Sequence, residues 1–199
     1  MKLFPGVPQY QRIMMAGAFV AVAVFSLSQQ RERVQQIGKM TLKDERTQVI
    51  DGDTVGVRGS AVRIVGIDAP DDDLPHLKSV SSQVLANLVA RDGGLDCSTT
   101  VFDFTLRREN QCRTDPESYG RLNLACRFKR NSASVAATMV AQGYAVDWRE
   151  FSGGAYVELM QKAASQRAGL WGVDYEGMRQ LAVRRATIPK NCQVDTIRK

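Results

Sequence analysis

The chain has 199 residues, which is enough for one domain with a hydrophobic core. Hydrophobic residues make up 44% and charged residues 24% of it, ordinary values for a globular protein, and no internal repeat indicates a solenoid. The formal net charge of +6 suits an anionic partner, but charge alone does not identify one.

The N-terminal segment has a different composition from the rest of the chain. Two basic residues precede an apolar run, Ile13–Leu27. The run is shorter than the roughly 20 residues of a membrane-spanning helix and suits a signal peptide within residues 1–28. Ser26 and Ser28 would be the small residues before a cut at Gln29. An uncut membrane anchor is an equal alternative, and a buried helix of the domain is a third.

Three short β-strands are predicted after a polar linker that covers residues 29–43. Thr47–Ile50 leads into the acidic turn Asp51–Asp53, after which Thr54–Val57 resumes an alternating pattern. The third strand is Ala61–Ile67. Short strands joined by turns favour a meander or a small barrel.

The middle of the chain predicts one helix and two more strands. The helix begins at Pro75 and ends at the glycine pair 93–94, because apolar residues recur every three or four positions between them. Leu95–Phe104 is expected to be the fourth strand, Arg107–Ser118 a long loop and Leu122–Phe128 the fifth strand.

Two more helices are expected over about Ser134–Gln142 and Ala155–Ala168. The order of elements fits an α+β fold, a five-stranded OB-fold barrel with three helices, over residues 44–172. OB-folds commonly bind oligonucleotides, although a fold alone does not give a function. Residues 173–199 form a basic C-terminal extension in which we expect no regular element.

Four cysteines follow the N-terminal segment: Cys97, Cys112, Cys126 and Cys192. An even number of cysteines after an export signal suggests disulfides, with three possible connectivities, and free buried thiols are the alternative. No CxxC motif occurs and His76 is the single histidine, which argues against a zinc site. His76 also lies beside Pro75 at a helix start, so we do not expect it to be a general base.

Several separated motifs carry the functional signal. In chain order they are Ile50–Val55 (IDGDTV), Arg63–Asp71 (RIVGIDAPD), Tyr119–Leu122 (YGRL), Gly143–Ala145 (GYA) and Gly169–Trp171 (GLW). Their order and residue types resemble those of the thermonuclease (staphylococcal-nuclease-like) family, over roughly Thr47–Gly172.

The resemblance implies a calcium-dependent endonuclease that cleaves DNA or RNA and leaves 3′-phosphate ends. It assigns Asp53, Asp68 and the carbonyl of Ala69 as calcium ligands, with the carboxylate of Asp51 nearby. These residue types suit the task because calcium prefers carboxylate and carbonyl oxygens. By pattern alone, Asp51 and Asp53 would form a β-turn cluster.

Arg63 and Arg121 are the phosphate clamp that the resemblance implies, and Tyr119 would stack or hydrogen-bond near the nucleotide. Arg63 lies between apolar neighbours in its predicted strand, and a buried charge without a partner is costly. A phosphate or a carboxylate must therefore meet Arg63. A structural salt bridge of Arg63 with a nearby aspartate, and a solvated loop position for Arg121, are the alternatives.

Asp71 departs from the family pattern, which has Glu there as the base or water-orienting group. Aspartate is one methylene shorter, and displacing a catalytic carboxylate by about 1 Å can cost on the order of a hundredfold in rate. Either Asp71 serves with a shifted backbone, or Asp72 or Asp73 replaces it, or the site is impaired. Trp148 and Phe151 align loosely with the family's base-contacting aromatics, and we expect them to pack in the core or on the surface.

Within this fold Cys97 and Cys126 lie on neighbouring strands, so a disulfide between them is expected, which leaves Cys112 and Cys192 to pair. The leading hypothesis is a monomeric, secreted, periplasmic or membrane-anchored endonuclease with Ca²⁺ as cofactor and DNA or RNA as substrate. The alternatives are an impaired module that binds nucleic acid or another polyanion at the cell envelope, and a structural membrane-tethered protein.

Overall fold

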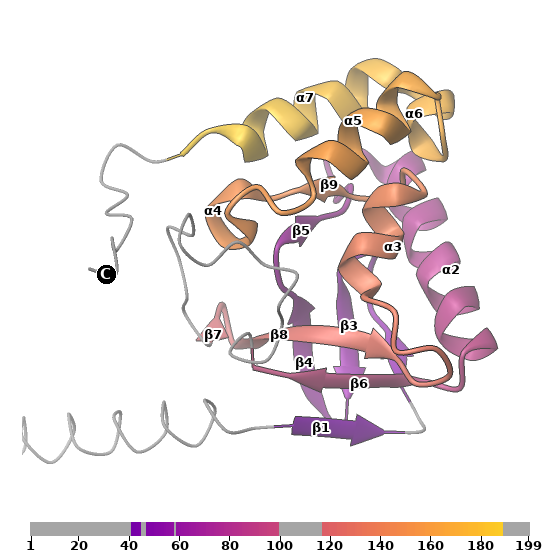
Figure 1. Cartoon of the computed structure of the whole chain (residues 1–199), viewed down its shortest axis with the longest axis vertical. Helices are drawn as coiled ribbons and strands as arrows, with labels where there is room; N and C mark the ends of the chain where they lie inside the picture. Colours follow the sequence, from indigo (N-terminus) through magenta and orange to yellow (C-terminus); the bar gives the residue numbers. More distant parts are fainter. Residues whose placement is uncertain (1–40, 45–46, 58, 100–116, 189–199) are drawn as a thin grey trace, which may run out of the picture. The chain divides into compact units, whose positions relative to one another are not determined.

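The structure is a computed structural model that describes residues 41–44, 47–57, 59–99 and 117–188. The predicted signal or anchor segment, Cys112 and Cys192 lie outside these ranges. Within them the chain has an α+β fold with a curled sheet, a small second sheet and several helices (Figure 1). No helix of the described ranges has the length and apolar character needed to cross a membrane.

The main sheet has seven strands in the order β1-β6-β8-β4-β3-β2, with β7 paired to β8. β4 and β8 run parallel, and the other paired strands run antiparallel. Residues 45–47 alone separate β1 from β2, which stand at opposite ends of this order, so the sheet curls until its two edges approach. The strands are β1 (Thr41–Asp44), β2 (Gln48–Val49), β3 (Thr54–Val57), β4 (Ser60–Ile64), β6 (Leu95–Ser98), β7 (Glu117–Ser118) and β8 (Arg121–Phe128).

A second, two-stranded sheet joins β5 (Ile67–Asp68) to β9 (Val146–Asp147) in antiparallel register. The Trp148 backbone N–H extends this pairing by donating to the Gly66 carbonyl at 3.0 Å. In Figure 1 these strands lie between the main sheet and the helices drawn above it. The small sheet thereby brings Asp68 and Trp148 close together from distant parts of the chain.

The helices begin where the sequence offers local start signals. Pro75 opens α2, Ser134 caps α3 by accepting from the Ala137 N–H at 3.3 Å, and Asp174 caps α7 by accepting from the Gly177 N–H at 2.9 Å. The helices are α2 (Pro75–Arg91), α3 (Val135–Ala141), α4 (Arg149–Ser152), α5 (Val157–Ser165), α6 (Leu170–Val173) and α7 (Tyr175–Ala186).

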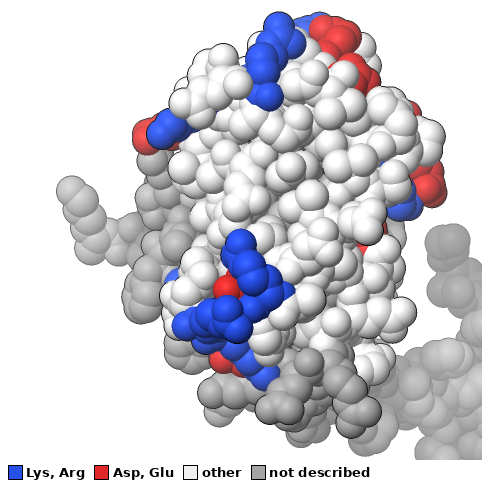
Figure 2. Space-filling model, turned by 90° about the vertical axis from the view of Figure 1, so that its right-hand side faces the viewer, with Lys and Arg blue, Asp and Glu red and all other residues white. Residues whose placement is uncertain are grey.

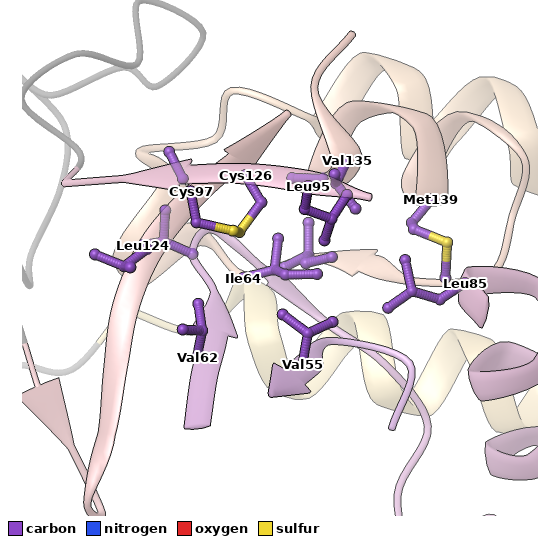
Figure 3. Close-up of a cluster of buried hydrophobic side chains, with 14 of the residues drawn as sticks. Val55, Val62, Ile64, Leu85, Leu95, Cys97, Leu124, Cys126, Val135 and Met139 are labelled. Carbon is purple, nitrogen blue, oxygen red and sulfur yellow. A yellow bond between two sulfur atoms is a disulfide. The ribbon is translucent and has the colours of Figure 1, made fainter. Parts of the chain in front are cut away.

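The main core lies inside the curled sheet and against α2 and α3. Val55, Val62 and Ile64 alternate inward from β3 and β4 and have no exposed surface. Figure 3 shows them with Leu85 of α2 and Met139 of α3. A second cluster forms beneath the C-terminal helices and includes Leu77, Val146, Leu170, Trp171, Met178 and Leu181.

The structure corrects the predicted element boundaries in two places. The expected strand Ala61–Ile67 is divided into β4 and β5, because Gly66 has φ of 87° and β5 pairs with β9 instead of continuing the main sheet. β1 begins at Thr41, within the expected linker 29–43. The 100–104 end of the predicted fourth strand lies outside the described residues.

The largest correction concerns the helices. Three were expected, whereas the described residues hold six, and α7 lies in the extension 173–199 where none was predicted. The sequence did carry a signal there, since Met178, Leu181 and Ala182 recur at helical spacing and are buried in the second cluster. The net basic character of the extension obscured this pattern.

Cys97 and Cys126 form a disulfide, which confirms the predicted pairing. The two residues face each other in the β6–β8 register and are buried (Figure 3). They are separated by 29 residues in the sequence, so the cross-link closes a loop that lowers the conformational entropy of the unfolded chain and stabilises the fold.

Removing this disulfide is expected to lower the free energy of unfolding by about 2–4 kcal/mol. The double variant Cys97→Ala/Cys126→Ala, compared with the native chain by urea unfolding, measures this difference. The native chain under a reducing agent serves as the matched comparison. Equal unfolding midpoints for all three samples would contradict the prediction.

Candidate functional site

The acidic turn before β3 places the Asp53 carboxylate beside the Arg63 guanidinium. Asp53 is buried, and its carboxylate accepts hydrogen bonds from the Thr54 hydroxyl at 2.9 Å, the Arg63 guanidinium at 2.8 Å and the Ala69 N–H at 3.0 Å. The Asp51 carboxylate accepts from the Asp53 N–H at 3.1 Å. Asp51 therefore shapes the turn, as the pattern-based alternative expected, while Asp53 faces charged side chains.

Gly52 lies in this turn where no larger residue fits. A Cβ atom on Gly52 would lie 2.0 Å from the Ser81 Oγ and 2.7 Å from the Ala69 Cβ. The Ser81 hydroxyl is itself engaged, since it donates to the Tyr144 carbonyl at 2.8 Å. The acidic turn is therefore wedged against α2 and the segment that follows Asp68.

Gly52→Ala is expected to destabilise the fold by about 1–3 kcal/mol, because the new methyl group overpacks this contact. Gly56→Ala is the matched control, since a Cβ atom there has only ordinary contacts at 3.7 Å or more. Thermal unfolding of the two variants measures the difference. A Gly52→Ala variant as stable as Gly56→Ala would show that the turn is loosely packed.

Arg63 joins the two carboxylates that were expected to be calcium ligands. It projects from β4 and donates from Nη2 to Asp53 at 2.8 Å and to Asp68. Its side chain is only 13% exposed, and its guanidinium lies 4.9 Å from the centre of the Trp148 ring. The carboxylate partners that sequence reasoning required for Arg63 are thus both present.

Burial raises the pKa of Asp53 from its ordinary value of 3.8 to about 7, and Arg63 opposes this rise by favouring the carboxylate. The neighbouring carboxylates of Asp68 and Asp51 contribute to this rise in the pKa, and the hydrogen bond from the Ala69 N–H opposes it. A raised pKa means that this group favours folding in acid, and that the benefit is lost as the pH rises from 3.8 through 7. A cation near Asp53 would offset that loss.

Arg121 lies on the same side of the sheet as the two aspartates. It opens β8, and its Nη1 donates to the Thr54 hydroxyl at 3.2 Å, which in turn donates to Asp53. The structure therefore brings Arg121, Arg63 and the two carboxylates together from four separated segments. This convergence is the spatial arrangement that the motifs predicted.

Arg63, Asp68 and Arg121 border a cavity of about 500 Å³, and Asp53 lies outside its lining but is hydrogen-bonded to Arg63. Tyr119 stands at its rim with 91% of its surface exposed and with φ of 50°, in the two-residue turn between β7 and β8. The lining residues are Arg63, Asp68, Ala69, Asp71, Asp72, Asp73, Ser118, Tyr119, Arg121, Trp148, Phe151, Leu181, Arg184 and Arg185.

Trp148 and Phe151 belong to this cavity rather than to packing alone. Their rings meet edge to face with centroids 4.7 Å apart. Trp148 is half-buried, and two guanidiniums lie over it, that of Arg63 and that of Arg185 at 4.2 Å. Trp148 packs against the main hydrophobic cluster, as expected, and it also forms part of the cavity wall, which the sequence did not predict.

Asp71, Asp72 and Asp73 form an acidic edge held by basic side chains. The Lys78 ammonium donates to Asp71 and to Asp72 at 2.7 Å each, and Arg184 pairs with Asp73 at 2.7 Å. The hydrogen bond from Lys78 holds the pKa of Asp71 below its ordinary value, so Asp71 is ionised at neutral pH. His76 lies outside the cavity lining and contacts Asp174 at 3.2 Å.

Sequence reasoning missed the arginines of α7. Arg185 donates from Nε to the Asp68 carboxylate at 2.7 Å, and Arg184 reaches the acidic edge. Both lie in the last turn of α7, and helix termini of this kind favour basic residues, so the pattern alone gave them an ordinary explanation. A prediction of α7 as a helix packed against the domain would have placed both arginines close to the cavity.

Basic side chains also gather elsewhere. Figure 2 shows one group of Lys and Arg on the face that lies to the right in Figure 1, whereas β7 and α4 lie on the left. Positive charge alone therefore does not locate the functional site. The candidate site is instead distinguished by carboxylates that lie next to guanidiniums.

The donor set of Asp53, Asp68 and the Ala69 carbonyl is of the kind that calcium prefers. No group of three or more His, Cys, Asp or Glu side chains in the described ranges is placed to hold a metal. Each carboxylate oxygen of Asp53 and Asp68 already accepts a hydrogen bond. By its chemistry the set fits calcium, and Asp68 Oδ2 is engaged by Arg185.

Comparison with known proteins gives one distant similarity. No family model matches the chain. The chain is 28% identical over 124 residues to the succinoglycan biosynthesis protein ExoI of Rhizobium meliloti (strain 1021). The match covers 62% of this chain and 61% of ExoI, so the chain spans less than two thirds of that relative's length.

Proposed function

We propose that the chain is an extracytoplasmic, calcium-dependent endonuclease that hydrolyses phosphodiester bonds in DNA or RNA. The observation that carries this proposal is the convergence of Arg63, Arg121 and Asp68 on one cavity, with Asp53 hydrogen-bonded to Arg63. Two guanidiniums beside two carboxylates suit a phosphate bridged to a cation. We also propose membership of the thermonuclease family, on the motifs that supply these residues.

The curled sheet supports the finer proposal of an OB-fold barrel over residues 44–172. The short connection between β1 and β2 joins the two ends of its strand order, and α2 connects β5 to β6. In the parallel pairing of β4 with β8, Arg63 faces Asn123, which is two positions from Arg121, so the two arginines lie on the same face of the sheet. A barrel of this kind has a curved face on which oligonucleotides bind.

The arginines supply the main catalytic contribution of the chain itself. The planar forks of Arg63 and Arg121 would bind the non-bridging oxygens of the scissile phosphate and stabilise the charge that develops there. Calcium, when bound by Asp53 and Asp68, supplies further positive charge at the same phosphate. Asp71 would orient the attacking water, and Tyr119 would contact the nucleotide from the rim.

The aromatic wall gives the nucleotide a second contact. Trp148 and Phe151 line the same cavity as Tyr119, and aromatic faces stack on bases without requiring a particular nucleotide sequence. The Cys97–Cys126 disulfide supports an oxidising location, because such cross-links persist outside the cytosol. The N-terminal segment would provide the signal or the membrane anchor.

The direct test is cleavage of single-stranded DNA and RNA by the purified chain, with and without a calcium chelator. We expect cleavage that stops on chelation and returns when calcium is added in excess. Cleavage that proceeds unchanged in the chelator would reject calcium dependence. No cleavage under any condition, together with tight binding of the same oligonucleotide, would favour the second candidate.

That second candidate is a catalytically impaired module that binds nucleic acid or another polyanion at the cell envelope. It is favoured by Asp71, which is one methylene shorter than the glutamate of the family and is held by Lys78 at 2.7 Å. The similarity to a protein named for succinoglycan biosynthesis is compatible with either candidate. The lining arginines would serve a polyanion without any hydrolysis.

A further inference from the structure

We propose that Arg185 is a built-in competitor of calcium at Asp68, and that calcium binding frees this arginine to contact the phosphate. The inference rests on the proposed function, since it concerns the same site. It goes beyond that function by giving α7 a role in setting the affinity for the metal.

The position of α7 is determined by its N-terminal cap and by hydrophobic packing along the helix. Asp174 caps its first turn, and Met178 and Leu181 are buried in the second hydrophobic cluster. The helix also packs against α4, α6 and β9. Its last turn is thereby held over the cavity, where Arg184 pairs with Asp73 and Arg185 pairs with Asp68.

Arg185 is held by two independent contacts. Its Nε donates to Asp68 Oδ2 at 2.7 Å, and its guanidinium lies 4.2 Å from the centre of the Trp148 ring. The stacking contact does not need Asp68, because a guanidinium binds the face of an indole by itself. If a cation took the carboxylate, Arg185 would keep its place over Trp148 with its donors directed at the cavity.

Arg63 and Arg185 differ in how easily a cation could displace them from Asp68. Arg63 is 13% exposed and bridges both carboxylates, whereas Arg185 is 34% exposed and meets Asp68 alone. A calcium ion and a guanidinium at the same oxygen repel each other strongly, because the charges would lie only a few ångströms apart. The more exposed partner is therefore the one that calcium displaces.

The test measures calcium binding itself, by isothermal titration calorimetry on the full chain. Arg185→Gln keeps the aliphatic stem but removes the charge, and we expect it to bind calcium about tenfold more tightly, or better. Arg185→Lys, which keeps the charge, is expected to bind as weakly as the native chain. Arg179→Ala removes a charge from the exposed part of α7, where Arg179 pairs with Glu176, and should also match the native affinity.

The outcomes separate this inference from the proposed function. Equal calcium affinities for the native chain and Arg185→Gln would overturn the inference and leave a calcium site in place. Absence of calcium binding in both would overturn the inference and calcium dependence together. Tighter binding by Arg185→Gln, lost again in Arg185→Gln/Asp68→Asn, would support the competition at Asp68. Thermal unfolding of each variant confirms that it is folded.

Discussion

Arg121→Ala is expected to lower the rate of phosphodiester cleavage by about 10²–10³-fold, because each positioned donor to the developing charge contributes on that scale. Arg121 is the cleaner of the two arginines to remove. Its Nη1 donates to the neutral Thr54 hydroxyl at 3.2 Å, and Arg121 forms no ion pair with a carboxylate of the described residues, so its loss leaves none of them without a guanidinium partner. Steady-state kcat/KM on a short single-stranded DNA measures the effect.

Arg127→Ala provides the matched control, since Arg127 lies on the same strand, β8, but outside the cavity lining and donates to the Ser132 carbonyl at 3.0 Å. We expect its rate to stay within about twofold of the native rate, because surface substitutions away from a site have small effects. Equal rates for Arg121→Ala and the native chain would reject the phosphate clamp.

Arg63→Ala should reduce the rate by a similar factor but for two reasons at once. Its removal takes away one guanidinium that would bind the phosphate. It also leaves the neighbouring carboxylates of Asp53 and Asp68 without their shared positive partner, which lowers the free energy of unfolding by about 3–5 kcal/mol for a buried pair. Arg63→Lys keeps the charge and loses the fork. Comparing its thermal unfolding and its rate with those of Arg63→Ala separates the two effects.

Asp71→Glu is the second substitution with a large expected effect, and it distinguishes the enzyme from the binding module. The added methylene brings the carboxylate to the family's length, and a displacement of about 1 Å can change a rate on the order of a hundredfold. We expect faster cleavage than in the native chain, measured as single-turnover rates at saturating oligonucleotide. Asp71→Asn should be slower than the native chain.

The result assigns the native function. A native chain that cleaves, with Asp71→Asn strongly impaired, supports the enzyme. A native chain that binds without cleaving, and an Asp71→Glu variant that cleaves, supports the impaired module. Lys78→Met is the companion variant, since it releases Asp71 from the ammonium 2.7 Å away and should raise the pKa of Asp71. A rate unaffected by all three substitutions would show that Asp71 does not orient water.

The sequence predicted the centre of the site well because its chemistry lies in short motifs on strands. Asp53, Arg63 and Asp68 sit at strand ends where alternation and turn residues are informative, and the β-pairings then bring them together. Arg121 was placed by its Tyr-Gly-Arg motif at the start of β8. The local sequence pattern was therefore enough to predict a site residue when its position depended only on the strand that carries it.

The sequence predicted the periphery less well because there the position depends on packing between distant elements. Trp148 reaches the cavity only because β9 pairs with β5, which its local sequence does not reveal. Arg185 reaches Asp68 only because α7 buries Met178 and Leu181 against a cluster formed by other helices. Tertiary contacts of this kind leave little trace in a local window.

The cross-link between β6 and β8 has a practical consequence for anyone who produces this protein. β8 carries both Cys126 and Arg121, so the strand that the disulfide anchors is also the strand that presents the clamp. Material made in a reducing cytosol would lack this anchor and could lose the arginine's alignment while retaining every catalytic side chain. Recombinant expression should therefore target the periplasm or include oxidative refolding before any assay of turnover.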